Sequence, residues 1–555
     1  MNVLAISILM FTFFLIYKVI YEYILESKSK NKLIKDYECT IDKFINKYYK
    51  AILFIFVVII FISRIYKFGE IPNEIGNDEA GSAYDAYCLA NYGVDRYLNK
   101  YPVYLTNYGD GQSPLFSYLI MLFIKLIGFN IYAIRLPELI LYIIEIIVSY
   151  LIASKFKDKR TALLFTFLII TCPWHIMASR VGLDCNLFSP LFMIDIWLLL
   201  NAKHDYNYII SGLFVGITLY TYAISWVIVP IFLLVFIIYM LMLKKINFKQ
   251  IMLLGIPIIL FAIPLIYMIL LNKGVFNKTD FGMFSIPKLY LFRSSEINIK
   301  NIWKYGMENI QTIFLNNNRT IYYFETPFFI IGCIELIKET IVSIKEKEFD
   351  FNSLMFIVFV SMLITNFMIR IESINKGNVL YVLILYIVTI GMLTVCRKSL
   401  LLSITNILII LVLFFYFERF YYLEYINYTG RCQDNKIYEI SRIIEEDVQN
   451  ENSKKIFYTN NKVTPYIYTL IANKVSPYDF YNTMLTSEGL NVIGYENYRF
   501  INEDNMLAYD KIIENRQDED YIFIIDKGYK EIISKLINAG YASWEYKSYV
   551  ILRNY

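Results

Sequence analysis

Long runs of apolar residues recur along most of this chain, and they constrain its fold more than any other feature of the sequence. Blocks of about 15 to 24 residues follow one another from Val3 to Tyr422, close to the length that an α-helix needs to cross a bilayer. Of the 555 residues, 57% are hydrophobic and 18% are charged, which is not the composition of a soluble protein. The sequence predicts a polytopic α-helical membrane protein with about 12–13 spans.

The predicted spans are 3–25, 49–67, 114–128, 133–154, 161–177, 187–201, 208–222, 225–243, 251–271, 322–337, 353–370, 377–396 and 400–422. The first lacks leading lysines and a small-residue cleavage site, so we expect a retained span rather than a cleaved signal. Residues 1–48 would then add an extra N-terminal span and a basic cytoplasmic linker. The transmembrane module would occupy residues 49–423.

Basic stretches indicate which ends of the spans face the cytoplasm. Lysines crowd residues 26–50. Further basic clusters lie at 155–160, 244–249 and 397–398. Because Lys- and Arg-rich loops stay in the cytoplasm, we expect outer loops at 68–113 and 272–321. The two apolar segments within 114–154 conflict with this assignment, and the sequence leaves open whether one of them fails to cross or a basic loop breaks the rule.

Residues 424–555 have a different composition and are predicted to form a domain of their own. An amphipathic helix is expected at 435–449. Short strands are expected at 455–459, 521–525 and 544–553, and helices at 463–473, 477–485 and 528–539. Strands mixed with helices in this way are typical of an α/β fold. We therefore expect a small extracytosolic α/β domain after the last span.

Several kinds of site are excluded by the residues that the chain lacks. Its 7 cysteines are dispersed without CxxC pairs, which argues against a disulfide framework or a cysteine metal site. Only 2 histidines are present, so a multi-histidine metal site is excluded. No P-loop, GxGxxG, HExxH or GxSxG pattern occurs. We expect neither nucleotide nor nucleic acid as a partner.

The acidic pair Asp78 and Glu79 interrupts this apolar chain within the first outer loop. Residues 80–92 are predicted to form a short helix with Asp78 near its N-terminus, where the backbone amides stabilise an ionised carboxylate. An ionised carboxylate at the membrane surface suits a general base acting on a lipid-borne substrate. The alternatives are that Asp78 only caps the helix or that the pair belongs to a solvated acidic loop.

Asp110 and Gln112 come just before the next span and would lie at the same membrane face as Asp78. Two acidic residues that flank one aqueous pocket are typical of an active-site entrance, and Asp78 with Asp110 would suit a divalent cation. Gly-Asp-Gly is also an ordinary turn sequence, which leaves a purely structural interpretation open.

Two further polar segments contain candidate ligands for an anion. In residues 173–186, His175 and Arg180 follow a span, and a guanidinium matches phosphate oxygens in two-pronged geometry. Residues 370–378 form a short polar break that contains Arg370, Asn375 and Lys376. The alternatives are an interfacial histidine and cations that extend from span ends toward water.

With these segments identified, the chain resembles the GT-C membrane glycosyltransferases, in particular the bacterial branch of protein mannosyltransferases and aminoarabinose transferases. The motifs that carry the resemblance occur in the order of that family. They are Asp78-Glu79, Gly111-Gln112-Ser113-Pro114, Gly128-Phe129 with Arg135-Leu136-Pro137, Pro173-Trp174-His175 with Ser179-Arg180, Tyr220-Thr221-Tyr222 and Ile374-Asn375-Lys376-Gly377-Asn378. The resemblance covers residues 50 to 420, and the tail looks like that of Gram-positive members.

The resemblance implies an inverting transfer of a sugar from a polyprenyl-phosphate donor to a protein, polymer or lipid outside the membrane. Asp78 would be the general base and Glu79 its support. Arg180, Lys376 and Arg370 would bind the donor phosphate, with Asp110, Gln112, His175 and Asn375 in the substrate pocket. No cofactor is required, and a divalent cation remains open.

Three departures from the family pattern qualify these expectations. Lys376 stands where the family has Arg, which puts two-pronged phosphate binding there in doubt. Gln112-Ser113-Pro114 replaces the Glu-Lys-Pro of the lipid A-modifying members, which argues against aminoarabinose transfer. The predicted span 3–25 also lies outside the family pattern.

Two other classes of function remain as alternatives. A multispan transporter or lipid flippase would place ionisable residues within its spans, as Glu138, Glu145 and Asp195 are here. A non-catalytic scaffold would use residues 424–555 to hold a partner.

Overall fold

The computed structural model describes residues 31–73, 75–277, 281–290, 301–314, 319–368, 377–396, 400–424, 434–447, 454–458, 464–487, 491–501, 521–546 and 548–553. The chain divides into two compact units. The helical unit comprises Met1–Phe68, Glu138–Ile263 and Ser294–Leu423. The mixed unit comprises Gly69–Pro137, Pro264–Arg293 and Glu424–Tyr555. Predicted span 3–25 and the residues Arg370, Asn375 and Lys376 lie outside the described residues.

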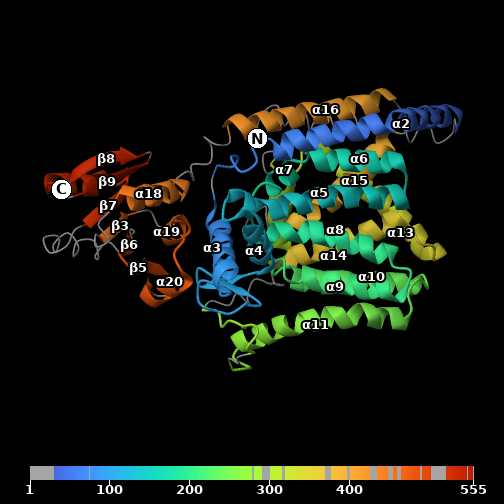
Figure 1. Cartoon of the computed structure of the whole chain (residues 1–555). Helices are drawn as coiled ribbons and strands as arrows, with labels where there is room; N and C mark the ends of the chain where they lie inside the picture. Colours follow the sequence, from blue (N-terminus) through green and yellow to red (C-terminus); the bar gives the residue numbers. More distant parts are fainter. Residues whose placement is uncertain are drawn as a thin grey trace. The chain divides into compact units, whose positions relative to one another are not determined.

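The helical unit is a bundle of helices, including most of α5 and α11, that run side by side (Figure 1). Its elements are α2 (Asn31–Ile60), η1 (Phe61–Ile65), α5 (Ile131–Phe156), α6 (Lys159–Thr171), α7 (Pro173–Ala178), η2 (Asp184–Leu187), α8 (Phe188–Asn201), α9 (Asp205–Thr218), α10 (Ser225–Met242), α11 (Phe248–Asn272), α12 (Ile302–Phe314), η4 (Tyr323–Glu325), α13 (Thr326–Glu346), α14 (Phe351–Met368), α15 (Asn378–Cys396), α16 (Leu400–Arg419) and η6 (Phe420–Glu424). The elements η1 and η6 are π-helical turns that continue α2 and α16.

Helix α15 is the buried centre of the bundle, with nearly every residue covered. Two glycines allow α13 to approach it closely. A methyl group at Gly391 would collide with the carbonyl oxygen of Phe328, and one at Gly332 would collide with that of Ile387. In a membrane, apolar side chains gain no hydrophobic free energy by leaving lipid for another helix. Small residues at helix crossings let the backbones approach closely and pack tightly instead.

Six helices among the described residues are long and apolar enough to cross a membrane, judged by length and composition. This is fewer than the 12–13 spans expected. Several predicted spans are shorter helices, such as α6 with 13 residues and α8 with 14. Predicted span 161–177 is divided because Cys172 precedes Pro173 and adopts extended backbone, which ends α6 at Thr171. Within 114–154, only α5 meets the length and composition of a spanning helix, whereas Leu115–Ile127 is a shorter apolar helix.

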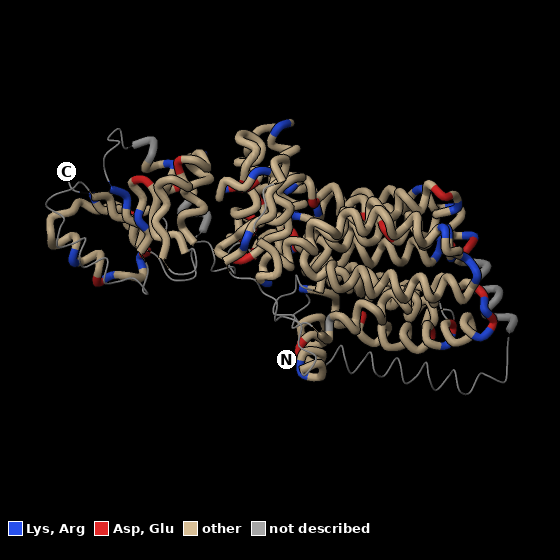
Figure 2. Tube along the Cα trace, turned by 90° about the horizontal axis from the view of Figure 1, so that it is seen from below, with Lys and Arg blue, Asp and Glu red and all other residues tan. Residues whose placement is uncertain are grey.

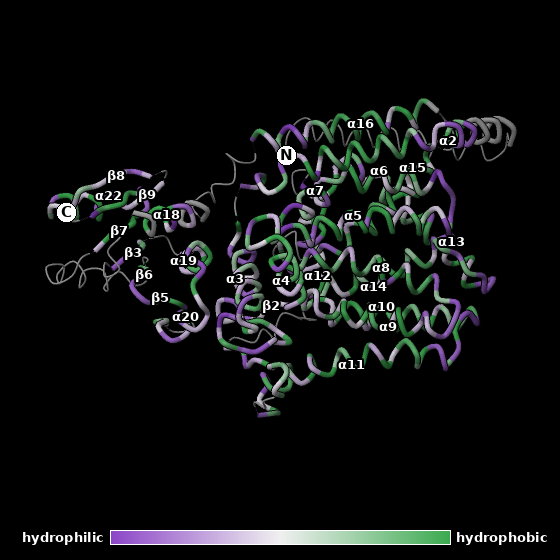
Figure 3. Tube along the Cα trace, in the orientation of Figure 1, coloured by the Kyte–Doolittle hydropathy of each residue, from purple (hydrophilic) through white to green (hydrophobic). Residues whose placement is uncertain are grey.

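Many charged residues of the helical unit gather at the ends of its helices, and a few acidic ones lie along them (Figure 2), whereas apolar residues cover most of the helix lengths (Figure 3). The start of α2 and the basic loops that follow α5 and α10 lie at one end, whereas α7 lies at the other (Figure 1). The described parts of three basic clusters that the positive-inside rule assigned to one side, at 31–50, 155–160 and 244–249, therefore share one end of the bundle.

The mixed unit contains the acidic loop predicted after the first span. Its elements there are α3 (Asn77–Tyr92), β1 (Leu105–Asn107), β2 (Asp110–Gln112) and α4 (Leu115–Ile127). Helix α3 begins three residues before the predicted helix 80–92 and so includes both acidic residues in its first turn. Gly93 follows it with a positive φ of 72°, which glycine adopts without strain and which ends the helix.

The C-terminal part of the mixed unit is an α/β domain, as predicted. Its elements are α18 (Asp434–Asp447), β3 (Lys454–Tyr458), α19 (Pro465–Asn473), α20 (Pro477–Thr483), β4 (Leu485–Thr486), β5 (Val492–Tyr495), β6 (Tyr498–Ile501), β7 (Tyr521–Asp526), α22 (Lys530–Asn538), β8 (Ala542–Tyr546) and β9 (Tyr549–Arg553). The strands form one sheet in the order β4-β5-β6-β3-β7-β9-β8. Strand β3 pairs in parallel with β6 and with β7.

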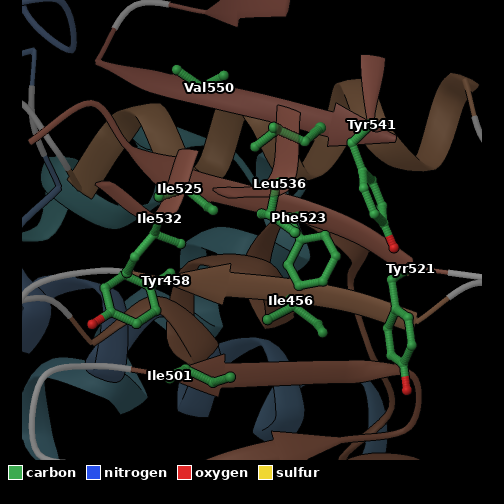
Figure 4. Close-up of a cluster of buried hydrophobic side chains, with 11 residues drawn as sticks. Ile456, Tyr458, Ile501, Tyr521, Phe523, Ile525, Ile532, Leu536, Tyr541 and Val550 are labelled. Atoms are coloured by element: carbon green, nitrogen blue, oxygen red, sulfur yellow. The ribbon is translucent and has the colours of Figure 1, made fainter. Parts of the chain in front are cut away.

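One face of this sheet packs against α22. Phe523 from β7 and Leu536 of the helix belong to a cluster of buried apolar side chains (Figure 4), and Leu552 from β9 is a further member of this cluster. Both strand residues are 0% exposed. All six residues of β7 are buried. A strand that is covered on both faces has a continuous apolar run rather than an alternating one, as residues 521–525 do.

Candidate functional site

Asp78 lies in the first turn of α3, and its side chain is exposed. Gly76 occupies the N-cap position, so Asp78 does not serve as the cap of this helix. The amide of Asn107 donates to Asp78 Oδ1 across 3.4 Å. An acidic side chain in the first turn interacts favourably with the helix dipole. The sequence therefore predicted the position of Asp78 correctly, but the contact with Asn107 was missed.

Glu79, the next residue, is completely buried. Arg135 binds its carboxylate with two prongs, from Nε to Oε1 at 2.7 Å and from Nη2 to Oε2 at 3.1 Å. Nη1 of the same arginine donates to the carbonyl oxygen of Pro72 at 2.7 Å. Glu79 thus ties the first turn of α3 to the start of α5 and to the segment that precedes α3.

A two-stranded hairpin, β1–β2, places further polar groups next to Asp78. Tyr108 and Gly109 form its turn, and both have positive φ, 51° and 84°, as two-residue hairpin turns require. Asn107 pairs with Asp110 across the strands. The Asp110 carboxylate accepts from the amide of Gly111 at 2.8 Å. Asp110 therefore helps to shape this hairpin, in agreement with the turn interpretation.

Gln112 is buried, and its amide group faces the first turns of α3. Nε2 donates to Ser82 Oγ at 2.9 Å and lies 3.5 Å from the carbonyl oxygen of Asp78. The buried oxygens Gln112 Oε1 and Asn107 Oδ1 have no hydrogen-bond partner in the described part of the chain. The structure thus brings Asp78, Asn107 and Gln112 together, with acceptor oxygens next to the carboxylate. Such a group suits a ligand that donates hydrogen bonds, such as a hydroxyl.

Metal-ligand geometry is not evident in the described ranges, which contain no group of three or more His, Cys, Asp or Glu residues arranged to hold an ion.

A second buried ion pair lies farther along α3 and was missed from the sequence. Arg96 donates to Asp85 from Nε at 2.9 Å and from Nη2 at 2.8 Å. Nη2 also donates to the carbonyl oxygen of Gly81 at 2.6 Å. The neighbouring Asp95 accepts from the amides of Tyr97 and Asn99. Burial, and then the nearby Asp85 carboxylate, raise the pKa of Asp95 to about 7.

In the helical unit, His175 is fully buried in α7 and is not at an interface with water. Its Nδ1 lies 2.9 Å from Arg64 Nη2, and its Nε2 lies 3.4 Å from Glu145 Oε2. Arg64 also donates to the carbonyl oxygens of Ile170 at 2.9 Å and Ile169 at 3.3 Å. His175 therefore joins the ends of α2 and α6 to the interior of α5.

Arg180 follows α7 and is also completely buried. Its Nη2 donates to the carbonyl oxygen of Lys67 at 2.9 Å, and its Nη1 donates to the hydroxyl of Tyr422 at 3.2 Å. The guanidinium lies 5.7 Å and 5.4 Å from the ring centres of Tyr421 and Tyr422. These contacts hold Arg180 at the junction of the turns that end α2 and α16, at the same end of the bundle as His175.

Asn378 connects two of the sequence motifs within the helical unit. Its Oδ1 accepts from the indole of Trp174 at 2.9 Å, and its Nδ2 donates to Asn186 Oδ1 at 2.8 Å. The segments 173–186 and 370–378 were singled out separately, and the described end of the second one contacts the first. Trp174 therefore has a buried hydrogen-bonding role in addition to its apolar contacts.

The described elements comprise a bundle of apolar helices, a polar loop and an α/β domain, and this fold is similar to the fold of solved GT-C membrane glycosyltransferases. The fold expected from the sequence motifs is therefore confirmed.

Individual proteins and one family model support the assignment. The family model for dolichyl-phosphate-mannose-protein mannosyltransferase matches residues 111–268. The structure of ArnT from Cupriavidus metallidurans bound to undecaprenyl phosphate is similar with a TM-score of 0.57 at 10% identity, over 92% of this chain and 98% of that chain. The oligosaccharyltransferase AglB from Archaeoglobus fulgidus is similar with a TM-score of 0.51 at 12% identity, over 92% and 75%. No curated protein matches the sequence.

Proposed function

We propose that this chain transfers a sugar from a polyprenyl-phosphate donor to a hydroxyl of an extracytosolic protein, polymer or lipid. The acceptor oxygen bonds to the anomeric carbon while the bond from that carbon to the phosphate oxygen breaks. The acceptor proton passes to the Asp78 carboxylate, and polyprenyl phosphate leaves with the bonding electron pair. Displacement in one step inverts the anomeric centre.

The observation that carries this proposal is the environment of Asp78 within a GT-C fold. Its carboxylate is exposed in the first turn of α3, and the adjacent Glu79 is held by Arg135. A general base must reach the proton that it removes, and it needs a fixed backbone to do so. ArnT bound to undecaprenyl phosphate and AglB in complex with dolichol-phosphate and an inhibitory peptide support a polyprenyl-phosphate donor.

Cations are needed where the leaving phosphate develops charge. Arg180, Arg370 and Lys376 are the residues proposed for this role, with Asp110, Gln112, His175 and Asn375 as the proposed pocket residues. A planar guanidinium such as that of Arg180 matches two phosphate oxygens at once. Arg180 is buried and donates to Lys67 and Tyr422, so a phosphate would have to replace these hydrogen bonds.

The proposed orientation places Asp78 and the α/β domain outside the cytoplasm. It is supported by the basic loops that gather at one end of the helical unit (Figure 2). The chain leaves the opposite end of α2 at Phe68, just before the acidic loop begins.

A lipid transporter remains the alternative function because the bundle contains buried acidic residues. Each of these residues accepts a hydrogen bond from a neighbouring segment. Glu138 accepts from the amide of Leu183 at 2.6 Å, Glu145 from Ser189 at 2.6 Å, and Asp195 from Thr218 at 2.7 Å. These contacts give the acids structural partners, as buried polar groups in a membrane bundle need.

The two functions are separated by one experiment on the purified full-length protein in liposomes. Undecaprenyl-phosphate sugars that carry radiolabelled mannose, glucose, galactose or aminoarabinose are supplied in the membrane with envelope extract as acceptor. We expect label to leave the lipid for an acceptor and undecaprenyl phosphate to accumulate. Movement of intact labelled lipid between leaflets without any transfer would support the transporter instead.

A further inference from the structure

Tyr468, on α19 of the α/β domain, contacts the turn that carries Asp78. Its hydroxyl lies 3.0 Å from the carbonyl oxygen of Ile75 and 2.9 Å from Asn77 Oδ1, and it donates its one proton to one of these oxygens at a time. The Tyr468 side chain is 1% exposed. A residue almost 400 positions along the chain thus bonds the residue immediately before the proposed base.

Asn77 is held from a second direction by the β1–β2 hairpin. The hydroxyl of Tyr108 donates to the carbonyl oxygen of Asn77 at 2.6 Å. The first residue of α3 therefore has one tyrosine hydroxyl on its side chain and another on its backbone. Gly76 precedes it without a side chain that could cap the helix, so no N-cap side chain restrains this residue.

We propose that Tyr468 is a positioning residue for Asp78, so that the α/β domain is part of the catalytic machinery rather than an appendage that recruits acceptors. This inference rests on the proposed function of Asp78 as the base. The Tyr468 hydroxyl fixes Ile75 and Asn77, these fix the first turn of α3, and that turn sets where the carboxylate stands. Displacement of a catalytic group by about 1 Å is enough to slow a reaction by up to 100-fold.

The same interface offers a matched control. The hydroxyl of Tyr84, in the middle of α3, donates to the carbonyl oxygen of Val475 at 2.9 Å. Tyr84 is as fully buried as Tyr468, and it also bonds the α/β domain through a hydroxyl and a carbonyl group. It lies six positions beyond Asp78 and does not contact the turn before it. Tyr84→Phe therefore removes an equivalent bond without freeing Ile75 and Asn77.

The test compares Tyr468→Phe, Tyr84→Phe and Asp78→Asn in the full-length protein. Release of undecaprenyl phosphate is measured with whichever undecaprenyl-phosphate sugar the wild type uses, and amide hydrogen exchange is followed over residues 75–83. We expect Tyr468→Phe to lower kcat by about 10-fold or more, with KM for the donor changed by less than about twofold. Exchange at 75–83 should become faster. Tyr84→Phe should leave kcat and this exchange near the wild-type values.

Two results would overturn the inference. One is a wild-type kcat for Tyr468→Phe in an assay in which Asp78→Asn is inactive. The other is unchanged exchange over 75–83 in Tyr468→Phe, a measurement that requires no active donor. An Asp78→Asn variant with full activity would instead refute the proposed role of Asp78 and would leave the exchange result to decide whether Tyr468 orders this turn.

Discussion

Arg135 and Glu79 form a buried, two-pronged ion pair, with Arg135 Nε 2.7 Å from Glu79 Oε1 and both side chains no more than 1% exposed. Arg135 is the first residue of a motif that the sequence singled out, and Glu79 is the second residue of another. The pair joins the two motifs within the mixed unit. It also leaves Asp78, one position earlier, as the exposed carboxylate of the turn.

Replacing Glu79 by Gln should destabilise the mixed unit strongly. Removing one partner of a buried pair leaves the other charge uncompensated, at a cost of about 3–5 kcal/mol. Asp78→Asn, an equivalent change one residue away at an exposed position, should alter stability by about 0.5 kcal/mol or less. Thermal unfolding of both full-length variants checks this expectation. Equal melting temperatures would show that the ion pair does not hold this turn.

Gly81, in α3, should not tolerate a methyl group. A Cβ atom there would lie 2.6 Å from Asn107 Oδ1, which is beside Asp78, and 2.9 Å from Arg96 Nη2, so both groups would have to move. We expect Gly81→Ala to cost about 1–3 kcal/mol and to reduce transfer. Gly76→Ala is the control because nothing lies within 4 Å of a Cβ atom at that position. Melting temperature and transfer rate are measured for both, and similar values for the two variants would contradict the packing described for Gly81.

The crossing of α13 and α15 gives a prediction for the helical unit. Gly391→Ala places a methyl group against the backbone carbonyl of Phe328, which a rigid helix cannot move aside, so we expect the variant to unfold at a lower temperature. Gly255→Ala in α11 is the control, because the new methyl group meets open space. The higher helix propensity of alanine should stabilise this variant by up to about 1 kcal/mol. A Gly391→Ala protein as stable as wild type would refute the close approach.

The buried carboxyl of Asp95 should make stability depend on pH. In the unfolded chain it releases its proton near its ordinary pKa of 3.8, whereas the folded protein keeps the proton to about pH 7. The folded state therefore binds more protons between these pH values. The stabilising contribution of the protonated Asp95 carboxyl is full below pH 4 and is lost as the pH rises to 7.

Asp95→Asn removes this titration and keeps an oxygen for the amides of Tyr97 and Asn99. We therefore expect the stability of wild type relative to Asp95→Asn to fall between pH 4 and pH 7, as measured by chemical unfolding at several pH values. A difference that does not change with pH would contradict a raised pKa for this group.

The elements that the sequence predicted well are those with a strong local signal. Helix α3 is one, because acidic residues open it and glycine ends it. The long apolar run of β7 is another. Strands β5 and β6 were missed because each has only 4 residues, too few to show alternation. Their turn has Glu496 at a φ of 41°, a position where glycine or asparagine would have been the recognisable signal.

The candidate site was predicted only in part, for a related reason. The sequence identified Asp78, Glu79, Gln112, His175 and Arg180 individually, since each interrupts an apolar stretch or matches a family motif. Their partners are not local. Arg135 is 56 positions from Glu79, and Arg64 is 111 positions from His175. Only the tertiary fold brings such residues together, and the same holds for Tyr468 and Asn77.

The most direct test of the central claim is the rate of sugar transfer by Asp78→Asn, measured beside Asp479→Asn in full-length protein with the polyprenyl-phosphate sugar that the wild type consumes. Asp479 is also an exposed carboxylate in the first turn of a helix, α20, but it lies outside the proposed site. Asparagine keeps the shape of the side chain and removes its basicity. We expect Asp78→Asn to lose about 100-fold or more in kcat while it remains folded, and Asp479→Asn to retain most of the activity. Transfer by Asp78→Asn at the wild-type rate would show that another group takes the acceptor proton.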